Sequence, residues 1–286
     1  MVVPVSVEYV AARRILLNAV VALHKHPDPV VLVGAQAIYV WTGSADFDVA
    51  VAPYTTDADL VLDPALLGEN PQVDEVMVAA GFTRTDNPGR WVTQVSVGKK
   101  DPLEVPVDLM VPEAVAGKGS RSANLKGQAK NAARRAHGLE AALVDNSRML
   151  IKSLDPDDSR SAEVTVASPA ALLIAKAHKL GERIAAEDKR PDAVKPKDAS
   201  DVYRLVLAEQ TAVEVGRRLR ELAEHEMAGS SVQEGMDHLR KLFSRRRQRG
   251  VELAVQALSA GGVPPATVEA TLEAYFGPLF AAYDGR

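Results

Sequence analysis

The sequence has no cysteine, so disulfide bonds and thiolate metal sites are excluded. Aromatic residues make up only 5% of the 286 residues. No apolar run approaches the roughly 20 residues that cross a bilayer. The first residues are apolar, but Glu8 and the pair Arg13–Arg14 follow early, and no cleavage site comes after them. We therefore expect neither a signal peptide nor a membrane contact, and we expect the cytoplasm as the compartment.

Acidic residues are also absent between Glu113 and Glu140, although the chain as a whole has a net charge of −4. That overall charge argues against a dedicated nucleic-acid binder. The interval contains six cations, Lys118, Arg121, Lys126, Lys130, Arg134 and Arg135. We call residues 114–138 the basic segment and predict a mobile loop there. A second basic cluster lies at 240–249. Two local basic patches on a mildly acidic chain indicate a localised anionic partner.

The apolar patterns predict two domains. Continuous or alternating apolar runs predict strands at 30–34, 57–63, 90–98, 103–112, 139–145, 148–154 and 162–168. Helical spacing in the same half predicts helices at 6–24, 35–43 and 70–81. From Ser168 onward the pattern is helical, with breaks near 228–231 and 261–265. We expect a mixed α/β domain over 1–166 and an all-helical domain over 167–286.

Acidic residues at predicted strand positions indicate a metal site. Asp57 and Asp59 are two residues apart at the start of a strand, so their side chains point to one face. Asp108 lies among apolar residues in a later strand. Three carboxylates brought together repel one another unless a cation lies between them, and oxygen ligands favour Mg²⁺. Taken alone, however, each signal has an ordinary explanation as a turn or a solvated strand edge.

A possible phosphate site lies upstream, in "VVLVGAQA" at 30–37. This pattern predicts a strand, a turn at Gly34 and the start of a helix. The N-terminus of a helix offers free N–H groups and a partial positive charge to a phosphate. A strand, glycine and helix in this order are common to α/β folds, so the motif gains weight only together with the aspartates.

The helical half contains a second group of charged residues. Lys176 and Arg183 are seven residues apart on one predicted helix and share a face. The next helix contributes Lys197, Asp198 and Asp201. A lysine there can hold a phosphate, and an aspartate can orient that lysine or accept a proton. The alternative is ordinary ion pairing within the helix, such as Lys197 with Asp201.

Five motifs in order, "LVGAQA", "TTDADLVL", "VPVDLMV", "LLIAKAHKLGER" and "KPKDASDVYRL", give the chain a family resemblance. It resembles the nucleotidyltransferase superfamily of the DNA polymerase β type, and within it the AbiEii-type toxins of type IV toxin–antitoxin systems. The resemblance covers roughly residues 28–112 and 168–206. It implies an α+β fold in two lobes, in which a mixed sheet with flanking helices precedes an all-helical domain.

The resemblance also implies roles for individual residues. Gly34 and Ala35 correspond to the phosphate-binding turn, while Asp57, Asp59 and Asp108 correspond to the metal ligands. The remaining site residues correspond to nucleotide-binding Lys176, Arg183 and Lys197 and to catalytic Asp198. Three features depart from the pattern: Ala35 replaces a second Gly or Ser, the gap from Gly34 to Asp57 is longer than in compact members, and Lys179 stands where the family has Ala. The long gap after Gly34 predicts a loop over 44–56 at the mouth of the site.

The implied function is Mg²⁺-dependent transfer of a nucleoside monophosphate from a nucleoside triphosphate to an acceptor hydroxyl. The toxin branch implies the 3′ end of tRNA as acceptor and a DNA-binding antitoxin as partner. In this reading the basic segment binds the RNA backbone; its alternative is a solvated surface loop. Two other functions stay open. One is transfer to a small molecule, as in antibiotic-modifying enzymes, and the other is a catalytically silent protein that binds a nucleotide or a partner.

Overall fold

The structure is a computed structural model that describes residues 5–26, 28–43, 55–96 and 101–286. It forms two compact units. The first consists of Met1–Ala37 and Pro53–Ala167, and the second of Ile38–Ala52 and Ser168–Arg286. The division falls within one helix, so a segment expected in the N-terminal domain belongs to the helical unit. Most of the loop expected at 44–56 lies outside the described residues.

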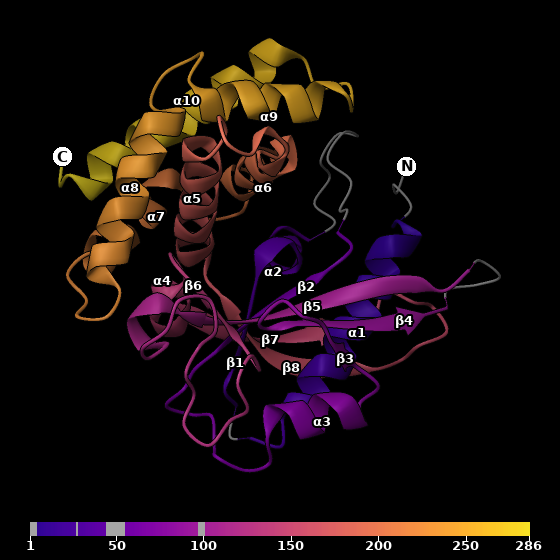
Figure 1. Cartoon of the computed structure of the whole chain (residues 1–286). Coiled ribbons are helices and arrows are strands. Elements are labelled where there is room, and N and C mark those ends of the chain that lie inside the picture. The colour runs from indigo at the N-terminus through magenta and orange to yellow at the C-terminus, as the bar shows by residue number, and fades with distance from the viewer. Residues whose placement is uncertain (1–4, 27, 44–54, 97–100) are drawn as a thin grey trace. The chain divides into compact units, whose positions relative to one another are not determined.

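The first unit is built on an eight-stranded mixed sheet (Figure 1). Its strands are β1 (Val30–Val33), β2 (Ala58–Leu62), β3 (Thr83–Arg84), β4 (Arg90–Val95), β5 (Leu103–Pro112), β6 (Arg134–Ala136), β7 (Asn146–Lys152) and β8 (Ser161–Ala167). The order is β3-β4-β5-β2-β1-β8-β7, with β6 paired to β5. The pairs β1–β8, β2–β5 and β5–β6 are parallel, and the others are antiparallel.

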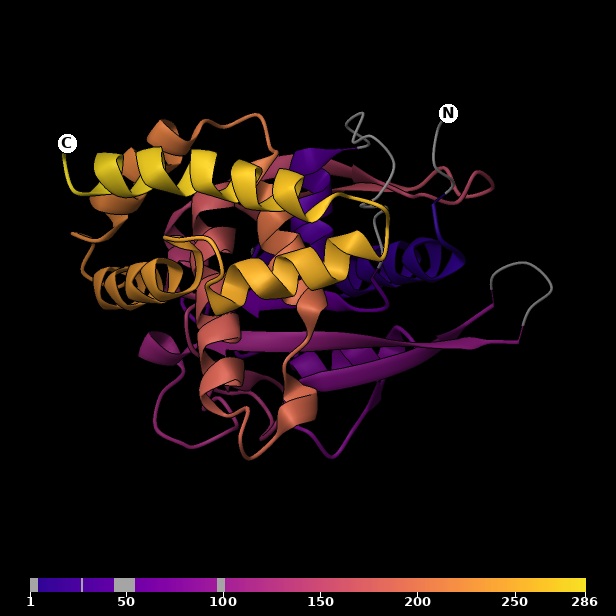
Figure 2. The ribbon, with the colours of Figure 1, turned by 90° about the horizontal axis from the view of Figure 1, so that it is seen from above.

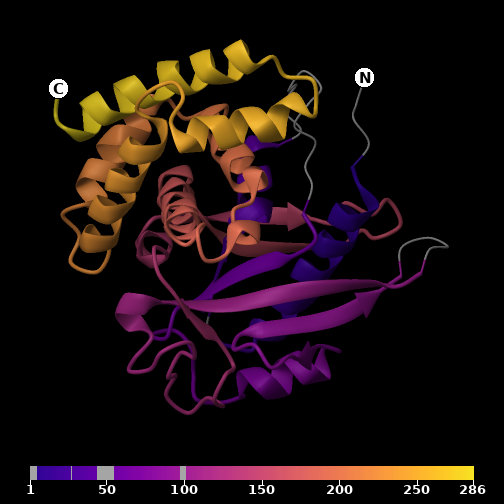
Figure 3. The same ribbon diagram turned by 45° about the horizontal axis from the view of Figure 1, so that its top comes forward.

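Helices flank this sheet. The elements are α1 (Val7–Leu23), the start of α2 (Gly34–Thr42), α3 (Val73–Ala79), the 3-10 helix η1 (Glu113–Val115) and α4 (Glu140–Val144). Ser6 caps α1 by accepting a hydrogen bond from the Tyr9 N–H, and Leu16 and Val20 on α1 are fully buried. Helix α1 packs along β2, β4, β5 and β8, with α3 beside it (Figure 3). The apolar faces of α1 and the sheet therefore form the core of this unit.

Four local expectations differ from the structure. Residues 139–145 form α4 and not a strand, because a short apolar run fits either element. Helix α3 begins at Val73, so Pro71 precedes it and is not in its first turn. β5 is an internal strand in regular register; at Pro106 it pairs with β4 alone, where the missing N–H is tolerated. Lastly, the basic segment contains β6 and joins the sheet.

Among the residues that the structure describes, the second unit contains six α-helices besides the end of α2. They are α5 (Pro169–Ala185), α6 (Pro196–Val206), α7 (Ala212–Leu222), α8 (Gly229–Phe243), α9 (Arg249–Ser259) and α10 (Pro265–Tyr283), with a 3-10 turn η2 (Pro191–Ala193) after α5. The pairs α7–α10, α6–α9, α5–α8 and α9–α10 pack together (Figure 2). In the core, the rings of Phe243 and Phe276 stack with centroids 5.0 Å apart.

The mixed sheet with flanking helices and the helical part together confirm the expected α+β class. Within the described ranges, no helix combines the length and the apolar character that spanning a bilayer demands.

Candidate active site

The sheet brings the predicted aspartates of the first unit together. β2 and β5 are parallel neighbours, and Asp59 lies directly opposite Asp108 in their register. Asp57 lies directly before β2, which begins at Ala58, and its spacing of two residues from Asp59 favours the same face for both side chains. Neighbouring Ala58 and Leu60 are fully buried, whereas the three aspartates are half-buried. Three carboxylates therefore lie on one partly solvated face, across strands about 4.8 Å apart.

Gly34 lies against Asp59. Its φ of +69° is in the left-handed region that glycine tolerates best. A Cβ at this position would meet Asp59 Oδ2 at 2.1 Å, so no other residue fits without moving the aspartate. Val33, the preceding residue, is the partner of Asp59 in the β1–β2 register. Ala35 follows as a buried residue in the first turn of α2.

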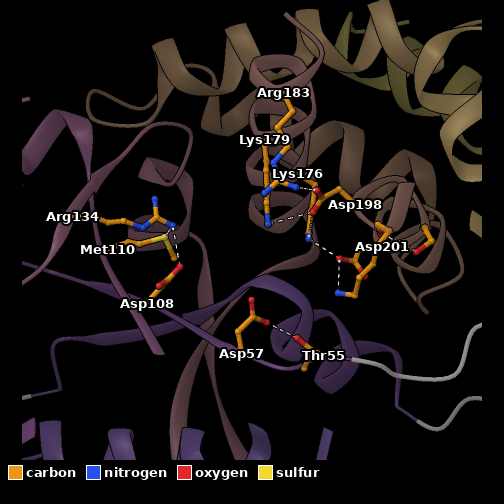
Figure 4. A network of polar contacts seen from close by, with 12 residues as sticks. Thr55, Asp57, Asp108, Met110, Arg134, Lys176, Lys179, Arg183, Asp198 and Asp201 are labelled. Carbon is orange, nitrogen blue, oxygen red and sulfur yellow. Dashed lines mark hydrogen bonds and ion pairs between the residues drawn. The ribbon is translucent and has the colours of Figure 1, made fainter. Parts of the chain in front are cut away.

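Asp57 is held by its side chain and by its backbone. Thr55 Oγ1 donates a hydrogen bond of 2.5 Å to Asp57 Oδ1 (Figure 4). Gln36 Nε2 donates to the Asp57 carbonyl at 2.9 Å and to the Ala12 carbonyl at 3.1 Å. Arg13 Nε in turn donates to Gln36 Oε1 at 3.0 Å. Since Gln36 and Arg13 are buried, this network fixes the start of β2 against α1 and α2.

Asp108 lies between two arginines. Arg90 NH1 is 3.4 Å from its Oδ1, and Arg134 NH2 is 3.5 Å from its Oδ2. Arg134 NH2 also approaches Met110 Sδ at 2.9 Å (Figure 4). Both carboxylate contacts are longer than the about 2.7–2.9 Å of a strong charge-assisted hydrogen bond. The carboxylate is thus loosely paired. Its oxygens and those of Asp57 and Asp59 are of the ligand type that a hard divalent cation prefers.

The structure separates the six cations of the basic segment into three groups. Arg121, Arg134 and Arg135 line a cavity of about 360 Å³ that Asp108 also lines. Lys118 and Lys130 line a neighbouring hollow of about 440 Å³. Lys126 is on the surface, where its Nζ is 2.7 Å from Glu69 Oε1.

In the second unit, the predicted residues of α5 and α6 form one ion-pair cluster (Figure 4). Buried Lys176 places its Nζ 2.6 Å from Asp201 Oδ2 and 3.3 Å from Asp198 Oδ1. Lys179 Nζ lies 3.3 Å from the same Asp198 oxygen, and Arg183 donates to the other one. The i,i+4 ion pair of Lys197 and Asp201, which was the alternative considered for this helix, is present with an N–O distance of 3.7 Å.

The charge state of Asp198 follows from this cluster. Burial alone would raise the pKa of the Asp198 carboxyl, but Lys176, Lys179 and Arg183 outweigh it and hold the pKa well below its usual range. Such a carboxylate stays ionised near neutral pH and is a weak proton acceptor. Of the two roles considered from sequence, orienting the cations therefore fits Asp198 better than acting as a base.

Sequence reasoning missed two residues of these sites. Lys179 contacts Asp198, although its position was treated as a departure from the family pattern. Its spacing of three residues from Lys176 and four from Arg183 already placed it on their helical face. Arg90 lies directly opposite Asp108 across β4 and β5. Nothing in the sequence indicated that pairing, because it depends on the register between β4 and β5.

The chain is similar in fold to a solved structure, at low sequence identity. No protein-family model matches the chain, and no curated protein matches it. A solved structure, an antigenic nucleotidyltransferase-like protein from Paracoccidioides brasiliensis, is 13% identical with a TM-score of 0.44. The match covers 92% of this chain and 98% of that chain. A similarity this low carries no inference about activity, so the resemblance to the toxin branch stays a prediction.

Proposed function

We propose that this protein is a Mg²⁺-dependent nucleotidyltransferase that moves a nucleoside monophosphate from a nucleoside triphosphate to an acceptor hydroxyl. The observation that carries the proposal is the register of β2 and β5. It sets Asp59 opposite Asp108, with Asp57 on the same face two residues earlier. A chain gains nothing in stability from grouping three like charges on one partly solvated face, so a cationic ligand is the simplest reason for them.

The aspartates are the ligands for the metal in this proposal. Asp57, Asp59 and Asp108 would hold Mg²⁺, which supplies charge neutralisation for the phosphates and the reacting oxygens when it is bound. Thr55 and Gln36 hold Asp57 in place for this role. Gly34 leaves the space that Asp59 occupies.

The turn at Gly34 is the proposed position of the triphosphate. The first-turn N–H groups of a helix have no partners within the helix, so those at the start of α2 would be available to an anion. Ala35 contributes backbone only, because it has no hydroxyl. The phosphates would then lie next to Asp59, whose carboxylate is in contact range of Gly34.

The reaction itself balances without another reactant. The acceptor hydroxyl oxygen attacks the α-phosphorus, a new P–O bond forms, and the bond between the α-phosphorus and the bridging oxygen to the β-phosphate breaks. Pyrophosphate leaves with that oxygen, and the hydroxyl proton passes to a carboxylate of the aspartate group. Positioning and electrostatics supply most of the catalysis in such phosphoryl transfers.

The cluster on α5 and α6 is assigned to nucleotide binding. Four cations, Lys176, Lys179, Arg183 and Lys197, surround the carboxylates of Asp198 and Asp201, which leaves a net charge of +2. Lys179 and Lys197 each keep 42% of their side-chain surface exposed. The cluster therefore retains accessible positive charge for a phosphate. Asp198 would hold the side chains of the cations in position.

For the acceptor we propose the 3′ end of tRNA, with growth arrest as the outcome and a DNA-binding antitoxin as partner. The family resemblance supports this assignment. The arginines beside Asp108 also support it, since a cationic antibiotic would favour an acidic acceptor site.

Labelling tests the proposal. The protein is incubated with Mg²⁺, total tRNA and each of four α-labelled nucleoside triphosphates in turn. We expect label in RNA with one or more nucleotides, and its loss in Asp59→Asn. Asp157→Asn is the matched control, because Asp157 is exposed on the turn between β7 and β8. Label in a small molecule but not in RNA would reassign the acceptor; no transfer at all would remove the proposal.

A further inference from the structure

The cavity beside Asp108 is lined by four arginines. Arg90 comes from β4, Arg134 and Arg135 come from β6, and Arg121 comes from the loop before β6. Among the described residues that line it, Asp108 is the only acidic one; the others are Asn87, Pro88 and Ser120. A cavity of about 360 Å³ with this lining selects for a compact anion.

The fold holds this cavity open at a junction of strands. β4 and β6 pair with the same side of β5, β4 up to Asp108 and β6 from Met110 onward. Gly89 lies at this junction with a φ of +71°. A Cβ there would meet the Leu109 carbonyl oxygen at 2.3 Å and Arg134 N at 2.4 Å, so a residue with a side chain does not fit. Fully buried Trp91 donates its indole N–H to the Ala132 carbonyl at 3.2 Å.

The arginines are not neutralised by their surroundings. Asp108 is shared by Arg90 and Arg134 through long contacts. Arg135 donates to the Gly117 carbonyl and to Glu113 Oε1. No acceptor for its buried Nε exists among the described residues. Arg121 is exposed. The four guanidinium groups are thus accompanied by two carboxylates, those of Asp108 and Glu113, which leaves a net charge of +2.

The order of the strands indicates whether this cavity is on the side of the nucleoside triphosphate or on the side of the acceptor. Gly34 follows β1, Asp59 is on β2, Asp108 is on β5, and Arg90 and Arg134 are on the strands beyond β5. The Gly34 turn and the arginine cavity therefore flank the aspartates on opposite sides. With the triphosphate at the Gly34 turn, the arginine cavity is on the side left for the acceptor.

We propose that the cavity formed by Arg90, Arg121, Arg134 and Arg135 binds a backbone phosphate of a polynucleotide acceptor. The inference rests on the proposed function, because it takes the Gly34 turn as the nucleotide side. Planar guanidinium groups bind phosphate oxygens in pairs, so this cavity fixes the acceptor strand close to Asp108. Its role is to position the acceptor without reading its bases.

The adjacent hollow extends the same binding path. Ser120 lines both spaces, and Lys118 and Lys130 line the second one. A strand with one phosphate in the arginine cavity can therefore place a neighbouring phosphate near these lysines. Lys126, which pairs with Glu69, is outside both spaces.

Binding of a short labelled oligoribonucleotide to the full chain, followed by fluorescence anisotropy without any nucleoside triphosphate, tests the inference. Arg121→Gln removes one cation from the cavity, and Lys126→Gln removes one cation from the same segment outside it. Arg121 is exposed, so its loss does not threaten the fold. We expect Arg121→Gln to raise the Kd about tenfold, which is the effect of losing one charged hydrogen bond. We expect Lys126→Gln to change the Kd little. The slope of log Kd against log salt should become smaller in magnitude by about 0.7, because one phosphate contact is lost.

Two results would overturn the inference. Equal weakening by both variants would mean that general charge, and not the cavity, attracts RNA. If Arg121→Gln weakens binding of inorganic pyrophosphate or a nucleoside triphosphate but leaves the oligoribonucleotide unaffected, the cavity belongs to the nucleotide. Because binding is measured without catalysis, an inactive protein that still loses RNA affinity through Arg121 would refute only the proposed transferase activity.

Discussion

At the scale of single residues, the contact between Gly34 and Asp59 gives the sharpest prediction for the first unit. Gly34→Ala forces a Cβ into the position of Asp59 Oδ2, 2.1 Å away. The backbone strain at positive φ costs about 1–2 kcal/mol, and moving the carboxylate adds to this. We expect nucleotide transfer to be lost together with a lower free energy of unfolding, measured by the labelling assay and by urea denaturation.

Gly81 is the matched control for this change. Its φ is +85°, but a Cβ there would meet nothing within 4 Å. Gly81→Ala therefore carries the backbone cost without the clash. If both variants lose equal stability and both keep activity, Gly34 does not define the position of Asp59.

A second residue-scale prediction concerns Asp198. Asp198→Asn leaves buried Lys176 with a weaker partner, which costs about 3 kcal/mol at about pH 7. The pKa of Asp198 is depressed in the folded state, so its contribution is present above the unfolded value of 3.8 and is lost as pH falls below it. We expect the difference in unfolding free energy between wild type and variant to stay constant down to about pH 4 and to narrow below that.

Lys197→Gln is the comparison for the ion-pair cluster. Lys197 is 42% exposed and 3.7 Å from Asp201 Oδ2, so its removal should change the free energy of unfolding by less than about 1 kcal/mol. A pH-independent difference for Asp198→Asn, or an equal effect of Lys197→Gln, would contradict the described charge balance.

At the scale of elements, Gln36 joins α1, α2 and the start of β2. Gln36→Glu keeps an acceptor for Arg13 but cannot donate to the Ala12 and Asp57 carbonyls. Each buried carbonyl left without a donor costs about 1–3 kcal/mol. Because the backbone of Asp57 loses its anchor, we expect a higher half-saturating Mg²⁺ concentration in the transfer assay.

The same substitution on the surface separates positioning from general damage. Gln94 is exposed on β4, and its Nε2 is 3.4 Å from Glu104 Oε2. Gln94→Glu should leave the Mg²⁺ dependence unchanged. An unchanged Mg²⁺ dependence in Gln36→Glu as well would show that Gln36 supports the fold but does not position Asp57.

The elements also show how far sequence reasoning reaches. β5 and α5 were predictable because their apolar patterns are long or strongly periodic, and β1 and β2 because their continuous apolar runs end at Gly34 and near Pro64. α4 was mistaken for a strand, since five residues contain too few turns to reveal a period. β6 was missed because "RRA" has no strand pattern and becomes a strand only by pairing with β5.

The candidate site also has features that were predictable from the sequence and features that were not. The residue types and their chain order, Gly34, Asp57, Asp59 and Asp108, were readable from the sequence. The register that sets Asp59 opposite Asp108 was not readable, because β2 and β5 are separated by β3 and β4 in the chain. The position of Arg90 beside Asp108 depends on another register, that between β4 and β5.

At the scale of the whole molecule, RNA binding should depend on the distribution of charge more than on the net charge. A chain of net charge −4 should bind RNA only through its local basic surfaces. If the arginine cavity and its adjacent hollow engage two to four phosphates, log Kd against log salt should have a slope of magnitude about 1.4–2.8. A slope steeper than about 4 would mean that the 240–249 cluster also binds; Arg245→Gln, which should have no effect, is the check.

The two compact units share one helix, α2, and each contains one of the charged groups described above. The proposed function is tested most directly by the identity of the group that the protein transfers. The most direct measurement incubates the protein with Mg²⁺, RNA and one nucleoside triphosphate labelled either at the α- or at the γ-phosphate. We expect label in RNA from the α-position only, release of pyrophosphate, and loss of both in Asp59→Asn. Label in RNA from the γ-position, or no transfer from any of the four triphosphates, would contradict the proposed nucleotidyl transfer.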